Sequence, residues 1–310
     1  MRISALYEGA GWLPRDDRGR IALRGPDGKA YLHGLLSNDI VALQPGGWCY
    51  ATLLTPQGRM ISDMRVFDLG DLLLMDVERP VVTTVVEHLD KFIIAEDVTV
   101  ENVTSTWAQI GLYGPRAQDV LAAASADPAW VPPLHTLPSS DLGVAGVDLI
   151  VPVESADAVG DALERAGGVQ VDPADVEVTR VEAGIPKFLV DMDTTTIPLE
   201  AGIEDRAISM TKGCYVGQEV IIRVLHRGGG RVAKKLVSLE VEGDAKRDDR
   251  LFAGDREIGR ITSVVDSPRL GKRMALGYVQ RDFVEPGTEL RVTTARGSAS
   301  AVVRKAVNAE

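Results

Sequence analysis

The chain has 310 residues and a mass of 33.3 kDa, which predicts two or three domains at about 100–200 residues per domain. Its apolar fraction of 45% and charged fraction of 25% exclude a disordered chain, a collagen and a disulfide-stabilised miniprotein. The net charge of −11 argues against nucleic acid as a partner of the whole surface.

The charge is divided unevenly along the chain. Residues 1–227 carry 18 Lys and Arg against 33 Asp and Glu, a balance of −15. Residues 228–310 carry 16 against 12, a balance of +4. We therefore expect two differently built parts, of which the basic C-terminal part is the better docking surface for an acidic partner.

Residues 20–113 show the patterns of mixed helices and strands. Asp27 is a candidate cap for a helix whose apolar face holds Tyr31, Leu32, Leu35 and Leu36. Pro80 suits the first position of a second helix, with an apolar stripe from Val81 to Phe92. Apolar runs bounded by turn residues predict strands over Trp48–Leu54, Met60–Leu69, Leu72–Val77, Val98–Val103 and Trp107–Tyr113.

A similar order of elements returns further along the chain. We expect a helix after Pro115, a strand near Leu149–Val151 and another helix over Ala156–Ala166. The sequence thus predicts an α+β body over residues 1–230, built from two interleaved subdomains that are candidates for related halves.

The pattern changes after the glycine triplet of residues 228–230. Val237, Leu239 and Val241 alternate with polar residues, and Gly254-Asp255, Pro286-Gly287 and Arg296-Gly297 are turn signals. This pattern predicts a β-barrel-like domain over residues 231–310, with the glycines as the linker.

Cys49 and Cys214 are the only cysteines, so no disulfide framework is implied and a reducing compartment is the simplest location. The first residues lack the apolar core of a secretory signal, and no run approaches the ~18 apolar residues of a membrane span. These features predict a cytoplasmic protein with no membrane partner.

Several well-known chemical motifs are missing from the sequence. It contains no GxGxxG, GxxxxGK[ST], HExxH or GxSxG. The four histidines (His33, His88, His135 and His226) share no metal-ligand spacing and suit surface or capped positions better than a metal site. Two cysteines are also too few for a self-sufficient iron–sulfur cluster, which normally takes four.

Thr211–Val220 concentrates unusual residues. Gly213 and Gly217 allow positive φ or close backbone approach, and residues 216–224 have helical apolar spacing. Cys214 would then lie just before a helix N-terminus and two residues from Lys212, and both features stabilise a thiolate. The alternative is a buried structural cysteine in a packing turn.

The segment KGCYVGQE (212–219) resembles the signature of the YgfZ/IBA57 family, folate-binding relatives of the glycine-cleavage T protein. Arg180–Pro186 is similar to the family's R-x-E-A-G-x-P, and Pro198-Leu199-Glu200 to the P-x-E that follows. Weaker similarities fall in the right order at Gly25-Pro26-Asp27, Leu35–Asp39 and Pro56–Asp63. The resemblance spans residues 20 to about 230, with a compatible β-rich tail.

This resemblance implies a three-part aminomethyltransferase-like fold around a central cavity for tetrahydrofolate or a derivative. Glu182 would accept hydrogen bonds from the pterin N–H groups; its alternative is a helix-face salt bridge near Arg180 or with Lys187. Asp63 faces the same cavity in the relatives, and Lys212 or Arg206 would meet the glutamate tail of folate. Arg180, Tyr215 and Gln218 belong to the two motifs and are assigned to the folate site with them.

Two departures from the family patterns bear on function. Transferases of the T-protein type have an acidic doublet where this chain has Ser62-Asp63, and a Phe-Gly turn in place of the cysteine motif, which disfavours aminomethyl transfer. Bacterial YgfZ proteins place tryptophans about where Arg18 and Val176 lie, so pterin stacking must use other residues or be weaker here.

The resemblance therefore favours a tetrahydrofolate-binding accessory protein of iron–sulfur cluster assembly or repair, with Cys214 as the working thiol and Lys212 beside it. Its partners would be folate and iron–sulfur client or assembly proteins. One alternative is a folate-dependent one-carbon transferase or demethylase, which needs a carboxylate in the pocket rather than the thiol. Another is a folate-binding regulator without chemistry.

Overall fold

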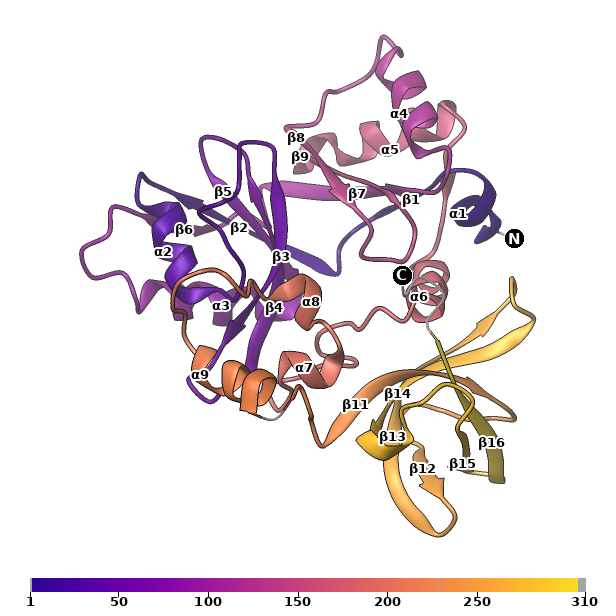
Figure 1. Cartoon of the computed structure of the whole chain (residues 1–310). Helices are drawn as coiled ribbons and strands as arrows, with labels where there is room; N and C mark the ends of the chain where they lie inside the picture. Colours follow the sequence, from indigo (N-terminus) through magenta and orange to yellow (C-terminus); the bar gives the residue numbers. More distant parts are fainter. Residues whose placement is uncertain (1, 228, 306–310) are drawn as a thin grey trace. The chain divides into compact units, whose positions relative to one another are not determined.

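The computed structural model describes residues 2–227 and 229–305, and the chain forms two compact units (Figure 1). The first unit takes in Met1–Ser140, Val144–Pro173 and Glu204–Val220. The second takes in Asp141–Gly143, Ala174–Ile203 and Ile221–Glu310. Within the described ranges, no helix is long and apolar enough to cross a membrane.

The first unit contains an antiparallel sheet with the strand order β3-β4-β5-β2-β6. Helix α3 packs on β2 and β6. Polar, turn-rich connections let neighbouring strands pair directly, as in a meander. The elements of this layer are β2 (Arg18–Arg24), α2 (Gly28–Leu35), β3 (Trp48–Leu54), β4 (Met60–Asp68), β5 (Leu73–Glu78), η1 (Arg79–Val81), α3 (Val82–Asp90) and β6 (Thr99–Asn102).

A second sheet of this unit has the order β10-β1-β7-β9-β8, with α4 and α5 packed on it. Trp12, Leu112, Leu149 and Leu163 lie in the core between helices and sheet. The elements are α1 (Ser4–Glu8), β1 (Gly11–Pro14), β7 (Trp107–Tyr113), α4 (Ala117–Ser125), β8 (His135–Ser139), β9 (Gly146–Pro152), η2 (Val153–Ser155), α5 (Ala156–Arg165) and β10 (Val169–Gln170).

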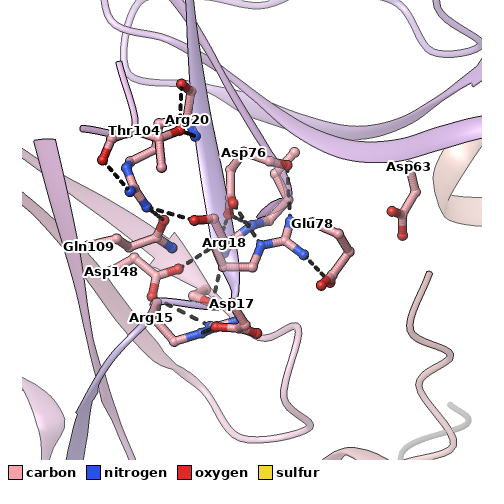
Figure 2. A network of polar contacts seen from close by, with 12 residues as sticks. Arg15, Asp17, Arg18, Arg20, Asp63, Asp76, Glu78, Thr104, Gln109 and Asp148 are labelled. Carbon is pink, nitrogen blue, oxygen red and sulfur yellow. Dashed lines mark hydrogen bonds and ion pairs between the residues drawn. The ribbon is translucent and has the colours of Figure 1, made fainter. Parts of the chain in front are cut away.

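A buried polar network lies in the first unit where the two sheets meet (Figure 2). Arg18 of β2 donates to Asp76 of β5 at 2.7 Å and to Glu78 at 2.5 Å. Arg65 of β4 pairs with Asp76 and with Asp148 of β9, the latter at 2.6 Å. Removing one partner of such a buried pair costs about 3–5 kcal/mol, so the network fixes how β2, β4 and β5 meet the second sheet.

The second unit contains a closed six-stranded barrel with the order β11-β14-β13-β12-β15-β16. This confirms the β-barrel-like domain that alternating apolar residues predict. Its interior is filled by Leu239, Leu251, Ile261 and Val292, among others. The strands are β11 (Lys234–Val241), β12 (Arg250–Ala253), β13 (Arg256–Ser267), β14 (Lys272–Gln280), β15 (Glu289–Thr294) and β16 (Gly297–Arg304), with η4 (Arg281–Phe283) after β14.

Further helices lie in the sequence between β10 and β11. They are α6 (Pro173–Glu182), α7 (Pro198–Ala201), α8 (Glu204–Ala207), α9 (Gln218–Ile222) and the π-helix η3 (Arg223–Arg227). In the second unit α7 packs on β11. In the first unit α8 packs on β3, which brings residues 204–220 against the first sheet.

Two local predictions need correction. Asp27 does hold the N-cap position of α2, but its carboxylate accepts the N–H of Asp97 and makes no bond to the helix. The stripe from Val81 to Phe92 ends early, because α3 stops at Asp90 and Phe92 is 39% exposed.

Candidate functional site

Cys214 lies in an irregular segment of the first unit between α8 and α9. Its thiol is free and exposed, whereas Tyr215 beside it is buried. The N–H of Ser209 bonds to the carbonyl of Ser37 at 3.1 Å, and this ties the start of the segment to the chain just after α2. The alternative of a buried structural cysteine therefore does not describe Cys214.

Lys212 anchors this segment to the end of α2. Its buried ammonium donates to the carbonyl oxygens of His33, Leu36 at 2.6 Å and Asn38 at 3.2 Å. It also lies 5.0 Å from the ring centre of Tyr215. The C-terminus of a helix carries partial negative charge and unpaired carbonyls, so an ammonium is well placed there.

Burial lowers the pKa of Lys212 to about 8, while the nearby charge of Asp39 and the thiol of Cys49 oppose this shift. Cys49 of β3 is also removed from water, and this burial raises the pKa of its thiol to about 12, so the thiol stays protonated at neutral pH. The hydrogen bonds of the Lys212 ammonium go to backbone carbonyls. These contacts do not test the expected stabilisation of the Cys214 thiolate by Lys212, which stays a prediction.

Gly217 fits the end of the segment closely against the β3–β4 turn. It has φ of +85°, and a Cβ at this position would lie 2.5 Å from the carbonyl oxygen of Thr55. Only glycine adopts this conformation and this approach at little cost. Gly213 has ordinary space, with its nearest atom 3.9 Å from an added Cβ.

The helix expected over residues 216–224 begins at Gln218 as α9 and continues as η3. The N–H of Gln218 bonds to the carbonyl of Tyr215 at 3.2 Å. Cys214 is therefore four residues before the helix, too far for the dipole effect expected of a residue directly at the N-terminus.

Asp63 of β4 forms a second cluster in the same unit. The hydroxyl of Tyr50 on β3 donates to Oδ2 of Asp63 at 2.6 Å. The guanidinium of Arg206 lies 4.5 Å from the ring centre of Tyr50. Asn38 joins the two elements by donating to the carbonyls of Tyr50 and Arg206, at 2.8 and 3.0 Å.

The other oxygen of Asp63, Oδ1, is buried and has no hydrogen-bond partner among residues 2–227 and 229–305. Figure 2 shows where Asp63 lies relative to the polar network around Arg18. Burial raises the pKa of this carboxyl, and the charge of Arg18, the Tyr50 hydroxyl and Arg206 offset part of the rise. A buried acceptor without a donor suits a ligand N–H group.

Glu182 and Arg180 lie on α6 in the second unit. Oε1 of Glu182 accepts the Ser267 hydroxyl at 2.5 Å, and Oε2 pairs with Arg269 at 2.8 Å. Glu182 thus forms an ion pair with Arg269, in the turn between β13 and β14. A pterin would have to share this carboxylate with Ser267 and Arg269.

The guanidinium of Arg180 is bound on several sides by the protein. It donates to Glu177, to Asp191 at 2.7 Å, to Ser263 at 2.9 Å and to the carbonyl of Ile185 at 2.5 Å. These contacts hold α6 to the loop before Met192 and to β13. The arrangement is that of a structural tie, and the assignment of Arg180 to folate stays a prediction.

The first unit thus brings together Asp63 and Arg206, and separately Lys212, Cys214 and Tyr215 at the end of α2. Tyr50 was not singled out from the sequence. Its place in the predicted strand Trp48–Leu54 offered a signal, because Thr52 pairs with Asp63 and side chains two residues apart share a face.

No group of three His, Cys, Asp or Glu side chains in the described ranges is placed to hold a metal ion.

Comparisons with known proteins agree with this architecture. Residues 3–132 match the GCVT N-terminal domain, and residues 234–307 match the glycine cleavage T-protein C-terminal barrel domain. The chain thus carries both the N-terminal and the C-terminal barrel domain that these two family models describe.

Similar proteins span almost the whole chain. It is 28% identical to an aminomethyltransferase of Desulforamulus reducens over 313 residues, or 93% of this chain and 83% of that protein. It is also 28% identical to an aminomethyltransferase of Listeria monocytogenes over 306 residues, with the same coverage. The crystal structure of glycine cleavage system aminomethyltransferase T from Bartonella henselae matches with a TM-score of 0.88, 20% identity, and coverage of 99% and 88%. The last comparison shows the T-protein-like fold.

Proposed function

We propose that this protein binds tetrahydrofolate or a derivative and uses the thiol of Cys214 in iron–sulfur cluster assembly or repair. The observation that carries the proposal is the exposed thiol within a segment fixed on both sides. Lys212 ties the segment to α2, and buried Tyr215 follows the cysteine. An exposed thiol in a fixed position is accessible to iron and to a partner that supplies or accepts sulfur.

The folate part of the proposal rests on the superfamily and on Asp63. Proteins of the GcvT family depend on tetrahydrofolate, in agreement with the folate cofactor that the sequence motifs imply. The unpartnered Oδ1 of Asp63 fits a group that offers N–H donors, as a pterin does. Glu182 would be a second acceptor, and exposed Arg206 a cation for the glutamate tail.

A second candidate is a folate-dependent one-carbon transferase, such as an aminomethyltransferase or a demethylase. Its support is the buried Asp63 carboxyl with a raised pKa, together with the relatives that are named aminomethyltransferase. A buried carboxyl with a raised pKa is a candidate to exchange a proton with a reacting amine. Against it stands Ser62, which replaces the first acid of the transferase doublet.

One complementation experiment separates these candidates. In a knockout strain, Cys214→Ser should fail to restore aconitase-type activity, whereas Cys49→Ala should restore it, since Cys49 is a half-buried strand residue. Glycine-cleavage activity measured in the same strains reports the transferase alternative. Full rescue of the cluster enzymes by Cys214→Ser would contradict the thiol mechanism.

Folate binding is tested separately by calorimetry with tetrahydrofolate and 5-formyltetrahydrofolate. We expect saturable binding to the wild-type protein and to Cys214→Ser alike, because the thiol is not a folate ligand in this proposal. Absence of binding at millimolar concentrations would contradict the folate assignment. Cytoplasmic location and iron–sulfur client proteins remain part of the same proposal.

A further inference from the structure

We propose that the barrel of the second unit carries a docking site for an acidic protein segment, formed by Lys234, Arg250, Arg260 and Tyr278. These four residues are called the basic row below. They come from β11, β12, β13 and β14, which are neighbours in the order β11-β14-β13-β12. If the protein serves iron–sulfur clients as proposed above, the acidic segment belongs to such a client.

Strand register places the basic row on one stretch of the barrel. Arg250 is paired directly with Arg260, and Arg260 directly with Tyr278. Lys234 is paired with Gln280, two residues beyond Tyr278 on the same strand. Directly opposed like charges on neighbouring strands are destabilising. The exposed carboxylates of Glu257 and Asp248 offset this repulsion in part, and a bound anion would offset it further.

The surface is hollowed at this place. A cavity of about 330 Å³ is lined by the basic row together with Glu257 and Gln280, among others. The ammonium of Lys234 lies over Tyr278, 4.7 Å from its ring centre. Tyr278 itself is buried, so the exposed arginines of the row are its contact residues, and arginine is one of the residues that most often dominate binding energy at protein interfaces.

The cationic side chains of the basic row form ion pairs with nearby carboxylates that a partner's carboxylates can replace. Arg250 donates to Glu257 at 3.0 Å, Arg260 lies 3.5 Å from Asp248, and Lys234 lies 3.9 Å from Glu200. The side chains of Arg250 and Arg260 are 57% and 46% exposed, and exposed pairs of this kind contribute little stability. Carboxylates of a partner can replace these contacts, and each guanidinium can then bind them through two N–H groups.

The charge of the chain favours a protein segment over other occupants. Residues 228–310 have a balance of +4, against −15 for residues 1–227, so an acidic partner is attracted to the barrel and repelled by the rest. The side chains of Lys234, Arg250 and Arg260 come from three strands and are 41%, 57% and 46% exposed, which suits several carboxylates spaced along a peptide. A single small anion would engage only part of it.

The test uses the full-length protein and a fluorescein-labelled hexaglutamate peptide, followed by fluorescence anisotropy at low ionic strength. Arg250→Glu with Arg260→Glu should weaken binding by about tenfold or more, since the sign of two contacting charges is reversed. Arg281→Glu with Arg296→Glu is the matched control. It makes the same change of net charge at exposed arginines outside the cavity, and should weaken binding less than about threefold through long-range attraction alone.

Three kinds of result would contradict the proposal. Equal losses in the two double variants would mean that overall charge attracts the peptide. Displacement by inorganic phosphate or free glutamate at concentrations similar to the peptide would indicate a small-anion site. Absence of hexaglutamate binding, or equal binding of hexaglutamine, would exclude acidic recognition. If the charge-reversed variant does not fold, Arg250→Gln with Arg260→Gln replaces it, with a smaller loss expected. Folate titration of the same samples tests the proposed function independently.

Discussion

Replacing Lys212 by methionine tests whether this residue anchors the Cys214 segment or acts as a countercharge to the thiolate. The substitution keeps most of the apolar stem and removes the ammonium that binds three carbonyls. Hydrogen bonds to a charged group contribute about 1.5–3 kcal/mol each. Against this, a pKa of about 8 in place of 10.5 corresponds to a net cost of about 3 kcal/mol for charging Lys212 in the folded state, which the variant no longer carries.

The three hydrogen bonds lost in Lys212→Met outweigh the charging cost that the variant avoids, so the variant should be less stable than the wild type. The net loss is limited because only the bond to the Leu36 carbonyl is fully buried, whereas the bonds to His33 and Asn38 are partly exposed to water. We therefore expect the free energy of unfolding to fall by about 1–3 kcal/mol. Urea denaturation measures this change, with Lys272→Met on β14 as the exposed control, where less than about 0.5 kcal/mol is expected.

The difference in unfolding free energy between wild type and Lys212→Met should also depend on pH. The folded-state pKa of Lys212 is lowered, so between pH 8 and 10.5 the unfolded chain binds the proton that the folded chain has released. Unfolding free energy rises with pH where the unfolded state binds more protons. The advantage of wild type over Lys212→Met should thus grow across this window. An unchanged denaturation midpoint, combined with a higher pKa for Cys214 alkylation, would refute the anchor and support the countercharge.

Three further predictions follow from single contacts. Glu182→Gln should weaken folate affinity by about 1–3 kcal/mol in calorimetry; unchanged affinity would remove Glu182 from the folate site. Asp63→Asn should stabilise the folate-free protein at pH 7, because burial raises the pKa of Asp63 and the wild-type fold loses stability as pH rises above 3.8 through that raised value; thermal melts of both proteins from pH 4 to 7 would show parallel curves if this is wrong. Gly217→Ala should cost about 1–3 kcal/mol through positive φ and the approach to Thr55, while Gly213→Ala, which meets no close atom, should be nearly neutral in the same urea titration.

Periodic patterns allowed much of the fold to be predicted. The strand expected over Trp48–Leu54 is β3, and that over Trp107–Tyr113 is β7, with the same bounds. Both are apolar runs between clear turn signals, so the local sequence and the tertiary fold favour the same conformation. The barrel followed from alternation, because its strands bury one face and expose the other.

Side-chain partners could be predicted less well, because they depend on register and on distant segments. Lys212 is two residues from Cys214 in sequence, yet its ammonium binds carbonyls around α2 more than 170 residues away. The salt bridge considered as an alternative role for Glu182 was placed near its own helix, whereas the structure shows an ion pair with Arg269, next to a barrel strand. Neither contact has a periodic signal, and each exists only once the fold has brought the two segments together.

The residues behind both candidate functions lie on or against the β3–β4 hairpin. A variant can therefore separate the two functions only if it leaves this hairpin intact. Asp63 belongs to the β3–β4 hairpin, and the Cys214 segment is fitted against the same hairpin through Gly217 and Thr55. A variant that distorts the hairpin would impair both the carboxyl and the thiol, and its loss of activity would not discriminate between them. Cys214→Ser and Asp63→Asn change one atom or group without altering side-chain volume much, so the hairpin can remain intact. The contrast between these two substitutions therefore attributes a lost activity to the thiol or to the carboxyl.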